Sequence, residues 1–122
     1  MTDSVETLLS RNLVEIFGET DASKRRMAIA AIWTDDGVFA EPHGRHVGRD
    51  ALNEAVGELQ RKFTGFVFTA LGSPQTFFDV GRLAWGHGPA GEPPKVTGLD
   101  VVTVRDGRIA TLYTFIDALP TA

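Results

Sequence analysis

The chain has 122 residues, 43% of them hydrophobic, and a formal net charge of −4 at pH 7. A chain of this length fits one domain with one core, and it needs no disulfide or metal to hold it together. It contains no cysteine, which excludes disulfide scaffolds, thiolate metal sites and cysteine nucleophiles. The acidic balance argues against nucleic-acid binding, which needs a dense basic surface. The one basic cluster, residues 24–26, is typical of a solvated helix face.

The N-terminal region and the hydropathy give no sign of export or of a membrane span. Asp3 and Glu6 stand where a signal peptide would have a basic start followed by an apolar run. No stretch approaches the roughly 18 consecutive apolar residues that a transmembrane helix needs. We therefore expect a cytoplasmic protein with no membrane or nucleic-acid partner, built as a single domain over residues 1–122.

The first half of the chain carries the helical signals. Apolar residues recur at spacings of three and four behind Asp3 or Ser4, either of which can cap a first helix. A second helix begins at Asp21 or Ser23, and its apolar positions include Met27. The predicted helices cover residues 5–17, 21–32 and 50–63. The segment between the last two is predicted as a turn at 34–37, a short strand at 38–40 and a loop at 41–48.

The second half of the chain is predicted to form a sheet. The predicted strands cover residues 65–71, 75–78, 83–87, 96–104 and 109–116. Hairpin turns are expected at 79–82 and, most clearly, at 105–108, and a Gly- and Pro-rich loop at 88–94. Helices followed by a meander of strands indicate the α+β class.

Two stretches resemble the nuclear transport factor 2-like superfamily and, within it, SnoaL-like and ketosteroid isomerase-like domains. Residues 33–44 and 48–52 resemble a helix–strand–loop–helix segment of these proteins, and residues 98–109 resemble their last hairpin. The resemblance implies three N-terminal helices packed on a curved antiparallel sheet, a cone-shaped, cystatin-like α+β barrel. It also implies a concave face that lines a pocket for a small apolar ligand, and a homodimer through the convex sheet face.

Glu41 is the first candidate catalytic residue. In the steroid isomerases that the chain resembles, a carboxylate directly before Pro in this loop is the general base beside a ketone, and Glu41-Pro42 matches that place. A carboxylate at the mouth of an apolar pocket suits such a role. The alternative is a loop carboxylate that faces water or caps backbone N–H groups.

Asp100 is the second candidate, because Asp is disfavoured inside a strand. Alternation places Gly98, Asp100 and Val102 on one face, and Gly98 leaves room beside the carboxylate. In the steroid isomerases, an Asp at this position stays protonated and donates a hydrogen bond to the dienolate oxygen. The alternative is a structural Asp, bonded to neighbouring side chains or lying at a dimer interface.

The chain departs from the isomerases because no tyrosine lies on its first helix; Asn12 and Leu13 stand there instead, and Tyr113 is the only tyrosine. The register of the last hairpin decides where Tyr113 points. A two-residue turn at 106–107 pairs Asp100 with Tyr113, whereas a three-residue loop pairs Asp100 with Leu112. We favour the second, with inward-facing residues Leu112, Thr114 and Ile116 and outward-facing residues Tyr113 and Phe115.

His87 is a third catalytic candidate, since imidazole titrates near neutrality and alternation places His87 on one face with Trp85. A surface or hydrogen-bonded histidine is the alternative. Glu41, His43 and His46 lie in one loop, but their loose spacing is a weak metal signal, so we expect no metal and no cofactor.

The pocket wall is predicted from apolar and aromatic residues, because small-molecule sites are lined mainly by such groups. The predicted substrate-binding residues are Trp33, Phe39, Phe63, Phe78, Trp85, Val102, Leu112 and Thr114. The function that follows is an acid/base isomerase, polyketide cyclase-like enzyme or dehydratase acting beside a carbonyl. The alternative is a non-catalytic ligand-binding or dimeric scaffold domain of the same fold.

Overall fold

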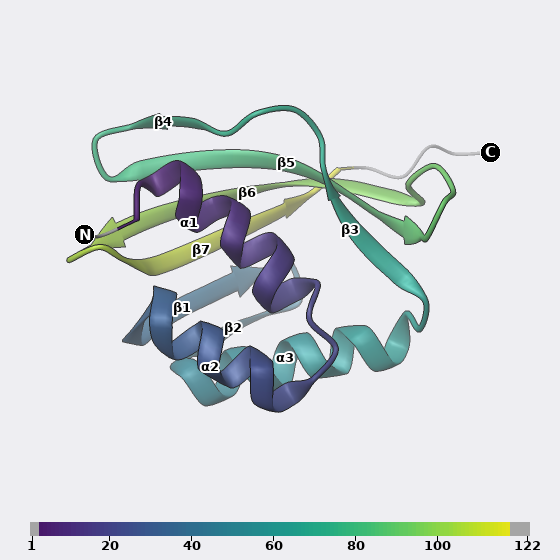
Figure 1. The fold of residues 1–122 in the computed structure, drawn as a ribbon, viewed down its shortest axis with the longest axis horizontal. Coiled ribbons are helices and arrows are strands. Elements are labelled where there is room, and N and C mark those ends of the chain that lie inside the picture. The colour runs from purple at the N-terminus through teal and green to yellow at the C-terminus, as the bar shows by residue number, and fades with distance from the viewer. Residues whose placement is uncertain (1–2, 118–122) are drawn as a thin grey trace.

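One curved sheet and three helical segments make up the structure, a computed structural model that describes residues 3–117 (Figure 1). In chain order the elements are α1 (Val5–Arg11), the π-helix η1 (Asn12–Phe17), α2 (Ala22–Ile32), β1 (Trp33–Glu41), β2 (Gly44–Val47), α3 (Arg49–Lys62), β3 (Phe66–Ala70), β4 (Gln75–Phe77), β5 (Val80–Pro89), β6 (Val96–Arg105) and β7 (Arg108–Ile116). The predicted α+β class is confirmed. No helix in this range is long and apolar enough to cross a bilayer.

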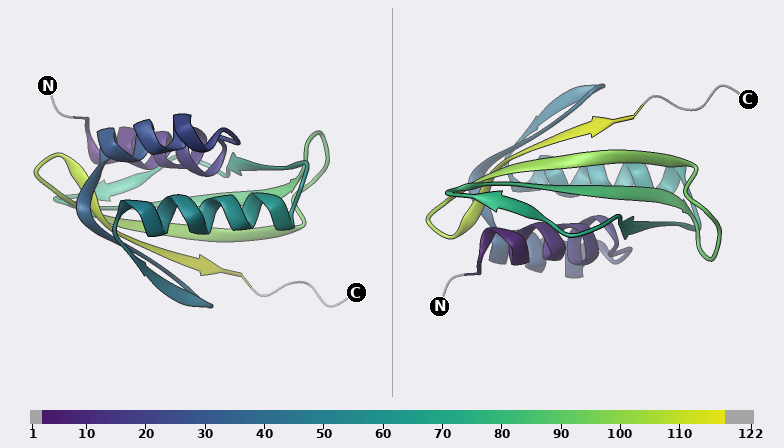
Figure 2. Two further views of the ribbon diagram at one scale, coloured as in Figure 1. Left: turned by 90° about the horizontal axis from the view of Figure 1, so that it is seen from below. Right: turned by 90° about the horizontal axis from the view of Figure 1, so that it is seen from above.

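The sheet has seven strands in the order β2-β1-β7-β6-β5-β3, and β4 pairs with β5. All pairs are antiparallel except β1 with β7, which is parallel. The sheet is therefore mixed rather than purely antiparallel, and it stays open instead of closing into a barrel. The helices lie on its concave side (Figure 2). α2 and α3 lie side by side, and α1 packs on β5.

Local capping sets the helix starts. The Ser4 side chain accepts a hydrogen bond from the Thr7 backbone N–H at 3.1 Å, and Asp21 accepts from the backbone N–H groups of Ser23 and Lys24. Each cap satisfies donors that an α-helix leaves unpaired at its first turn. The predicted first helix is confirmed over residues 5–17, although its second half is a wide π-turn that ends at Gly18.

Two predictions on the second helix are wrong. Met27 is 74% exposed, and Arg25, expected on a solvated face, is only 4% exposed. The Arg25 guanidinium donates to the Asn53 and Gln60 side-chain oxygens at 2.8 and 2.7 Å and to the Glu19 carbonyl at 2.8 Å. These bonds join α2 to α3 and to the turn before α2. A pattern of apolar spacing has no means of identifying a guanidinium that is buried because neutral oxygens surround it.

The strand boundaries differ from the prediction at three places. β1 is one strand over 33–41 where a turn was expected at 34–37, and β2 lies where a loop was expected at 41–48. The β4–β5 turn is at Phe78 and Asp79 rather than at 79–82, so β5 extends from Val80 to Pro89. Phe78 adopts a positive φ of 49°, which aromatic residues rarely do, so its type gave no turn signal.

The β6–β7 hairpin has neither of the two registers that the sequence left open, and the favoured three-residue loop is wrong. Its turn has two residues, Asp106 and Gly107, both at positive φ. A bulge at Ala110 then adds one residue to β7, so that Asp100 pairs with Thr114 rather than with Tyr113 or Leu112. The predicted facing is confirmed, because Leu112 is fully buried while Tyr113 is 45% exposed.

Replacing Arg25 with Ala tests the buried guanidinium. The change leaves the Asn53 and Gln60 side-chain oxygens without this donor, so we expect the free energy of unfolding to fall by about 3 kcal/mol. Arg26→Ala removes the same charge from the exposed neighbouring position and is expected to cost less than about 0.5 kcal/mol. Urea unfolding of both variants measures the difference. Equal losses would mean that Arg25 acts only through its charge.

Candidate functional site

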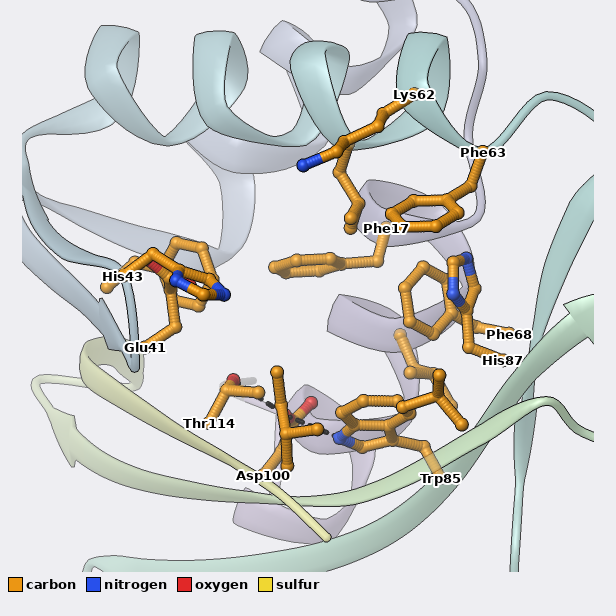
Figure 3. Close-up of a pocket in the computed structure, with 15 residues that line it drawn as sticks. Phe17, Glu41, His43, Lys62, Phe63, Phe68, Trp85, His87, Asp100 and Thr114 are labelled. Carbon is orange, nitrogen blue, oxygen red and sulfur yellow. Dashed lines mark hydrogen bonds between the residues drawn. The ribbon is translucent and has the colours of Figure 1, made fainter. Parts of the chain in front are cut away.

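A cavity of about 260 Å³ lies between the concave face of the sheet and the helices (Figure 3). Its walls are mostly apolar, and they include the aromatic rings of Phe17, Phe39, Phe63, Phe68 and Trp85. Its polar lining consists of six side chains: Glu41, His43, Lys62, His87, Asp100 and Thr114. An apolar cavity with a few convergent polar groups is the usual form of a small-molecule site.

The structure places the three candidate catalytic residues, Glu41, His87 and Asp100, on this one cavity. Among the predicted substrate-binding residues, the cavity is lined by Phe39, Phe63, Trp85 and Thr114. The other four, Trp33, Phe78, Val102 and Leu112, do not line it.

These four residues lie in two other places. Phe78 is 95% exposed at the β4–β5 turn. Trp33, Val102 and Leu112 are buried in the core at the end of the sheet where α1 packs on β6 and α2 on β7. There the Trp33 indole N–H donates to the Asn12 side-chain oxygen at 2.9 Å. Helix packing fills this end of the concave face and leaves the cavity to the other end.

The sheet register brings Glu41 and Asp100 together. Ala40 pairs with Tyr113 in the parallel β1–β7 pair, so Glu41 comes next to Thr114, and Thr114 pairs with Asp100. The three residues therefore form a row across three adjacent strands. Because neighbouring strands are about 4.8 Å apart, the backbones at Glu41 and Asp100 are separated by about 10 Å. All three side chains line the cavity, with Thr114 between the two acids.

Asp100 is buried at the bottom of the cavity, with only 4% of its surface exposed. Its Oδ1 accepts hydrogen bonds from the Trp85 indole N–H at 3.0 Å and from the Thr114 hydroxyl at 2.9 Å. Within residues 3–117, Oδ2 receives no side-chain hydrogen bond, which leaves it for a ligand. Burial raises the pKa of Asp100 to about 6, against the lowering effect of the two hydrogen bonds.

Gly98 makes the Trp85–Asp100 contact possible. Gly98 pairs with Trp85 across β5 and β6, and the indole lies over it. A Cβ atom at this position would collide with the Trp85 ring and with the carbonyl oxygen of Phe115. The space that the sequence suggested beside the carboxylate is therefore occupied by the indole that donates to it.

Glu41 ends β1, and its side chain is 17% exposed at the rim of the cavity. Its Oε1 is 3.5 Å from Nε2 of His46 in β2, and the His46 ring stacks on Phe39. His43 extends from the β1–β2 turn to the same side of the cavity (Figure 3). Among the described residues, no group of three or more His, Asp or Glu side chains is arranged to hold a metal ion.

His87 lies across the cavity from Glu41 and is surrounded by aromatic rings (Figure 3). Its ring stacks on Phe68 with centroids 4.1 Å apart, and it meets the rings of Phe63 and Phe66 edge to face. Burial lowers the pKa of His87 from its ordinary value near 6.5. The imidazole is therefore neutral at pH 7, and can both donate and accept a hydrogen bond.

Lys62 is the charged cavity residue that the sequence interpretation missed; the apolar lining residues that it missed are Phe17, Leu59, Phe68 and Val96. Lys62 lies in the last turn of α3, on the same face of the helix as Leu59 and Phe63. Both of these residues also line the cavity. The helical spacing of 59, 62 and 63 is the signal that predicts it, once Phe63 is taken as a wall residue.

The comparisons with known proteins identify the family. A family model for the SnoaL-like domain matches residues 11–112. No curated protein matches the chain.

Three solved structures match over most of their length. A "putative isomerase of the SnoaL-like family" from Agrobacterium tumefaciens is 23% identical, with a TM-score of 0.86 over 92% of this chain and 96% of that one. A "putative ketosteroid isomerase" from Kribbella flavida is 14% identical, with a TM-score of 0.75 over 99% and 83%. A "putative polyketide cyclase" from Sinorhizobium meliloti is 19% identical, with a TM-score of 0.67 over 88% and 93%. At these identities the likeness concerns the fold.

The raised pKa of Asp100 predicts a pH-dependent contribution to stability. The native state binds a proton at Asp100 more tightly than the unfolded chain, whose ordinary value is 3.8. The contribution is therefore fully present below about pH 3.8 and is lost as the pH rises through about 6. We expect Asp100→Asn to lower stability relative to the wild type by about 2.4 kcal/mol more at pH 4 than at pH 8.

Urea unfolding at the two pH values measures this difference. Asp106→Asn, at the exposed β6–β7 turn, is the matched control and should follow the wild type. A stability difference for Asp100→Asn that does not change with pH would refute the assignment of the titration to Asp100.

Proposed function

We propose that this chain, which belongs to the SnoaL-like domain family, binds a small apolar carbonyl compound and catalyses proton transfer at the carbon beside the carbonyl. The observation that carries the proposal is the convergence of Glu41, His87 and Asp100 from three different strands on one apolar cavity. Tuned acids and bases gather at such sites because desolvation sets their proton affinity.

Each residue has a role that its surroundings support. Glu41, at the rim, takes the proton from the carbon beside the carbonyl, and the electron pair of that C–H bond moves to the carbonyl oxygen. Asp100, protonated, donates a hydrogen bond to the oxygen through Oδ2. Glu41 then returns the proton to another carbon in an isomerisation. His87 holds a polar substituent on the opposite wall as a neutral donor or acceptor.

The pKa of Asp100 near 6 suits this role when a ligand fills the cavity. An apolar ligand displaces water from Oδ2 and so favours the neutral acid further. Trp85 and Thr114 hold the carboxyl group in place through Oδ1, which fixes the direction in which Oδ2 points. A preorganised donor of this kind stabilises charge only as it develops on the oxygen.

The reaction class is proposed as isomerisation, cyclisation or dehydration. The neighbours named as isomerases and a cyclase support this class. One observation favours a non-catalytic binding domain instead: Leu13, an apolar residue, lines the cavity from the first helix, so that helix offers no second hydrogen bond to an oxyanion.

Glu41→Gln tests the proposal. Deuterium exchange into the carbon beside the carbonyl of 2-tetralone, followed by NMR, reports proton abstraction without knowledge of the natural substrate. We expect the catalysed exchange rate to fall at least about 100-fold, since a carboxamide cannot take the proton. Binding of the ketone should stay within about threefold.

Glu54→Gln, which changes an exposed carboxylate on α3, is the control and should exchange like the wild type. Ketone binding without catalysed exchange in the wild type would favour the binding domain. Unchanged exchange in Glu41→Gln would remove Glu41 from the mechanism.

We also propose that the outer face of the sheet joins two copies of the chain. Tyr113 and Phe115 are 45% and 57% exposed on the outer face of β7, and large exposed apolar side chains mark association surfaces. Phe115→Arg introduces charges that a symmetric contact would bring together. We expect sedimentation equilibrium to give a dimer for the wild type and a monomer for this variant. A monomeric wild type would contradict the proposed dimer.

A further inference from the structure

We propose that Lys62 binds an acidic group of the ligand, so that the cavity selects amphipathic carboxylates over neutral compounds of the same shape. An amphipathic carboxylate here is an apolar ring or chain that ends in a carboxylate. The inference rests on the proposed function in one respect only, namely that this cavity is the ligand site. It adds the chemical class of the ligand and the residue that recognises it.

The first observation is the position of Lys62 at the opening of the cavity. Lys62 is exposed and also lines the cavity, so it lies where the cavity meets solvent. Its side chain leaves the last turn of α3, and Asp100 lies on the opposite wall (Figure 3). Asp100 is only 4% exposed, whereas Glu41 lies at the rim on the β1 side. A ligand whose carbonyl group reaches Asp100 therefore has its far end beside Lys62.

The second observation is that Lys62 has no ion-pair partner in the part of the chain that the structure describes. Within residues 3–117, the ion pairs join Arg11 to two carboxylates, Arg105 to Asp36 and His46 to Glu41. Glu41, the carboxylate at the same opening, is thus in contact with His46 rather than with Lys62. The ammonium group is left free to pair with a ligand.

A basic residue in the last turn of a helix also compensates the helix dipole. That effect accounts for Arg61 as well as for Lys62, since both lie in the last turn of α3. Arg61 extends back along the helix toward Gly57 and does not line the cavity. The dipole therefore does not explain why one of the two reaches the cavity, and Arg61 serves as a matched control.

Because the chain has a negative net charge, a preference for an anionic ligand would point to a specific cation in the cavity. The chain carries a formal charge of −4, and both Glu41 and Asp100 line the cavity, so the overall field disfavours an anionic ligand. A preference for an anion then has to come from a cation close to it. Lys62 is partly in water, so we expect a preference of about fivefold rather than a larger one.

The experiment compares two ligands of one shape, 2-naphthoate and 2-naphthamide, by isothermal titration calorimetry at pH 7.5. We expect the wild type to bind the carboxylate about fivefold more tightly than the amide, and less so in 0.5 M salt. Lys62→Met should abolish the preference and leave amide affinity within about twofold. Lys62→Arg should keep the preference, and so should Arg61→Met, which makes the same change in net charge.

The outcomes separate the inference from the proposed function. Equal affinities for the two ligands in the wild type, or a preference that survives Lys62→Met, overturns the inference while the cavity remains a ligand site. A loss of preference in Arg61→Met as large as in Lys62→Met also overturns it, because the effect is then one of overall charge. Binding of neither ligand overturns the inference and counts against the proposed function as well.

Discussion

The carboxyl group of Asp100 is buried, and the strands around it provide the hydrogen-bond donors that its burial requires. An ionised carboxylate in an apolar site costs several kcal/mol unless donors compensate it. The compensation comes from the Trp85 indole and the Thr114 hydroxyl, and both depend on backbone details. Trp85 fits over β6 because residue 98 is a glycine, and Thr114 faces Asp100 because the bulge at Ala110 shifts β7 by one residue.

The protein has a second buried charge, Arg25, and the contrast between the two shows what a site needs. Arg25 makes three hydrogen bonds to neutral oxygens, lies away from the cavity and joins α2 to α3. Asp100 makes two hydrogen bonds through one oxygen only, so its burial is incompletely compensated and its pKa rises. Burial also lowers the pKa of Arg25, so the contrast between the two groups lies in their position. Arg25 joins two helices, whereas Asp100 lines the cavity with one oxygen that receives no side-chain hydrogen bond within residues 3–117.

Several features of fold and site were predictable because their causes are local. Capping residues and apolar spacing predict the helices, and Asp100 stands out because a carboxylate inside a strand needs a special reason. The exceptions have non-local causes. The sequence near Ala110 carries no sign of a bulge, Arg25 is buried only because Asn53 and Gln60 come from α3, and Phe78 is exposed because the chain turns at an aromatic residue.

The parallel pairing of β1 with β7 is the non-local feature on which the site depends most. More than seventy positions separate Glu41 from Thr114 along the chain, yet the pairing places them side by side, and Thr114 in turn pairs with Asp100. An antiparallel arrangement would carry the end of β1 toward the opposite end of β7, away from the cavity. Glu41 would then remain a carboxylate before a proline, with the same local sequence, but without Asp100 opposite it. The topology of the sheet therefore brings the two acids to one cavity, which the local motif around Glu41 alone does not determine.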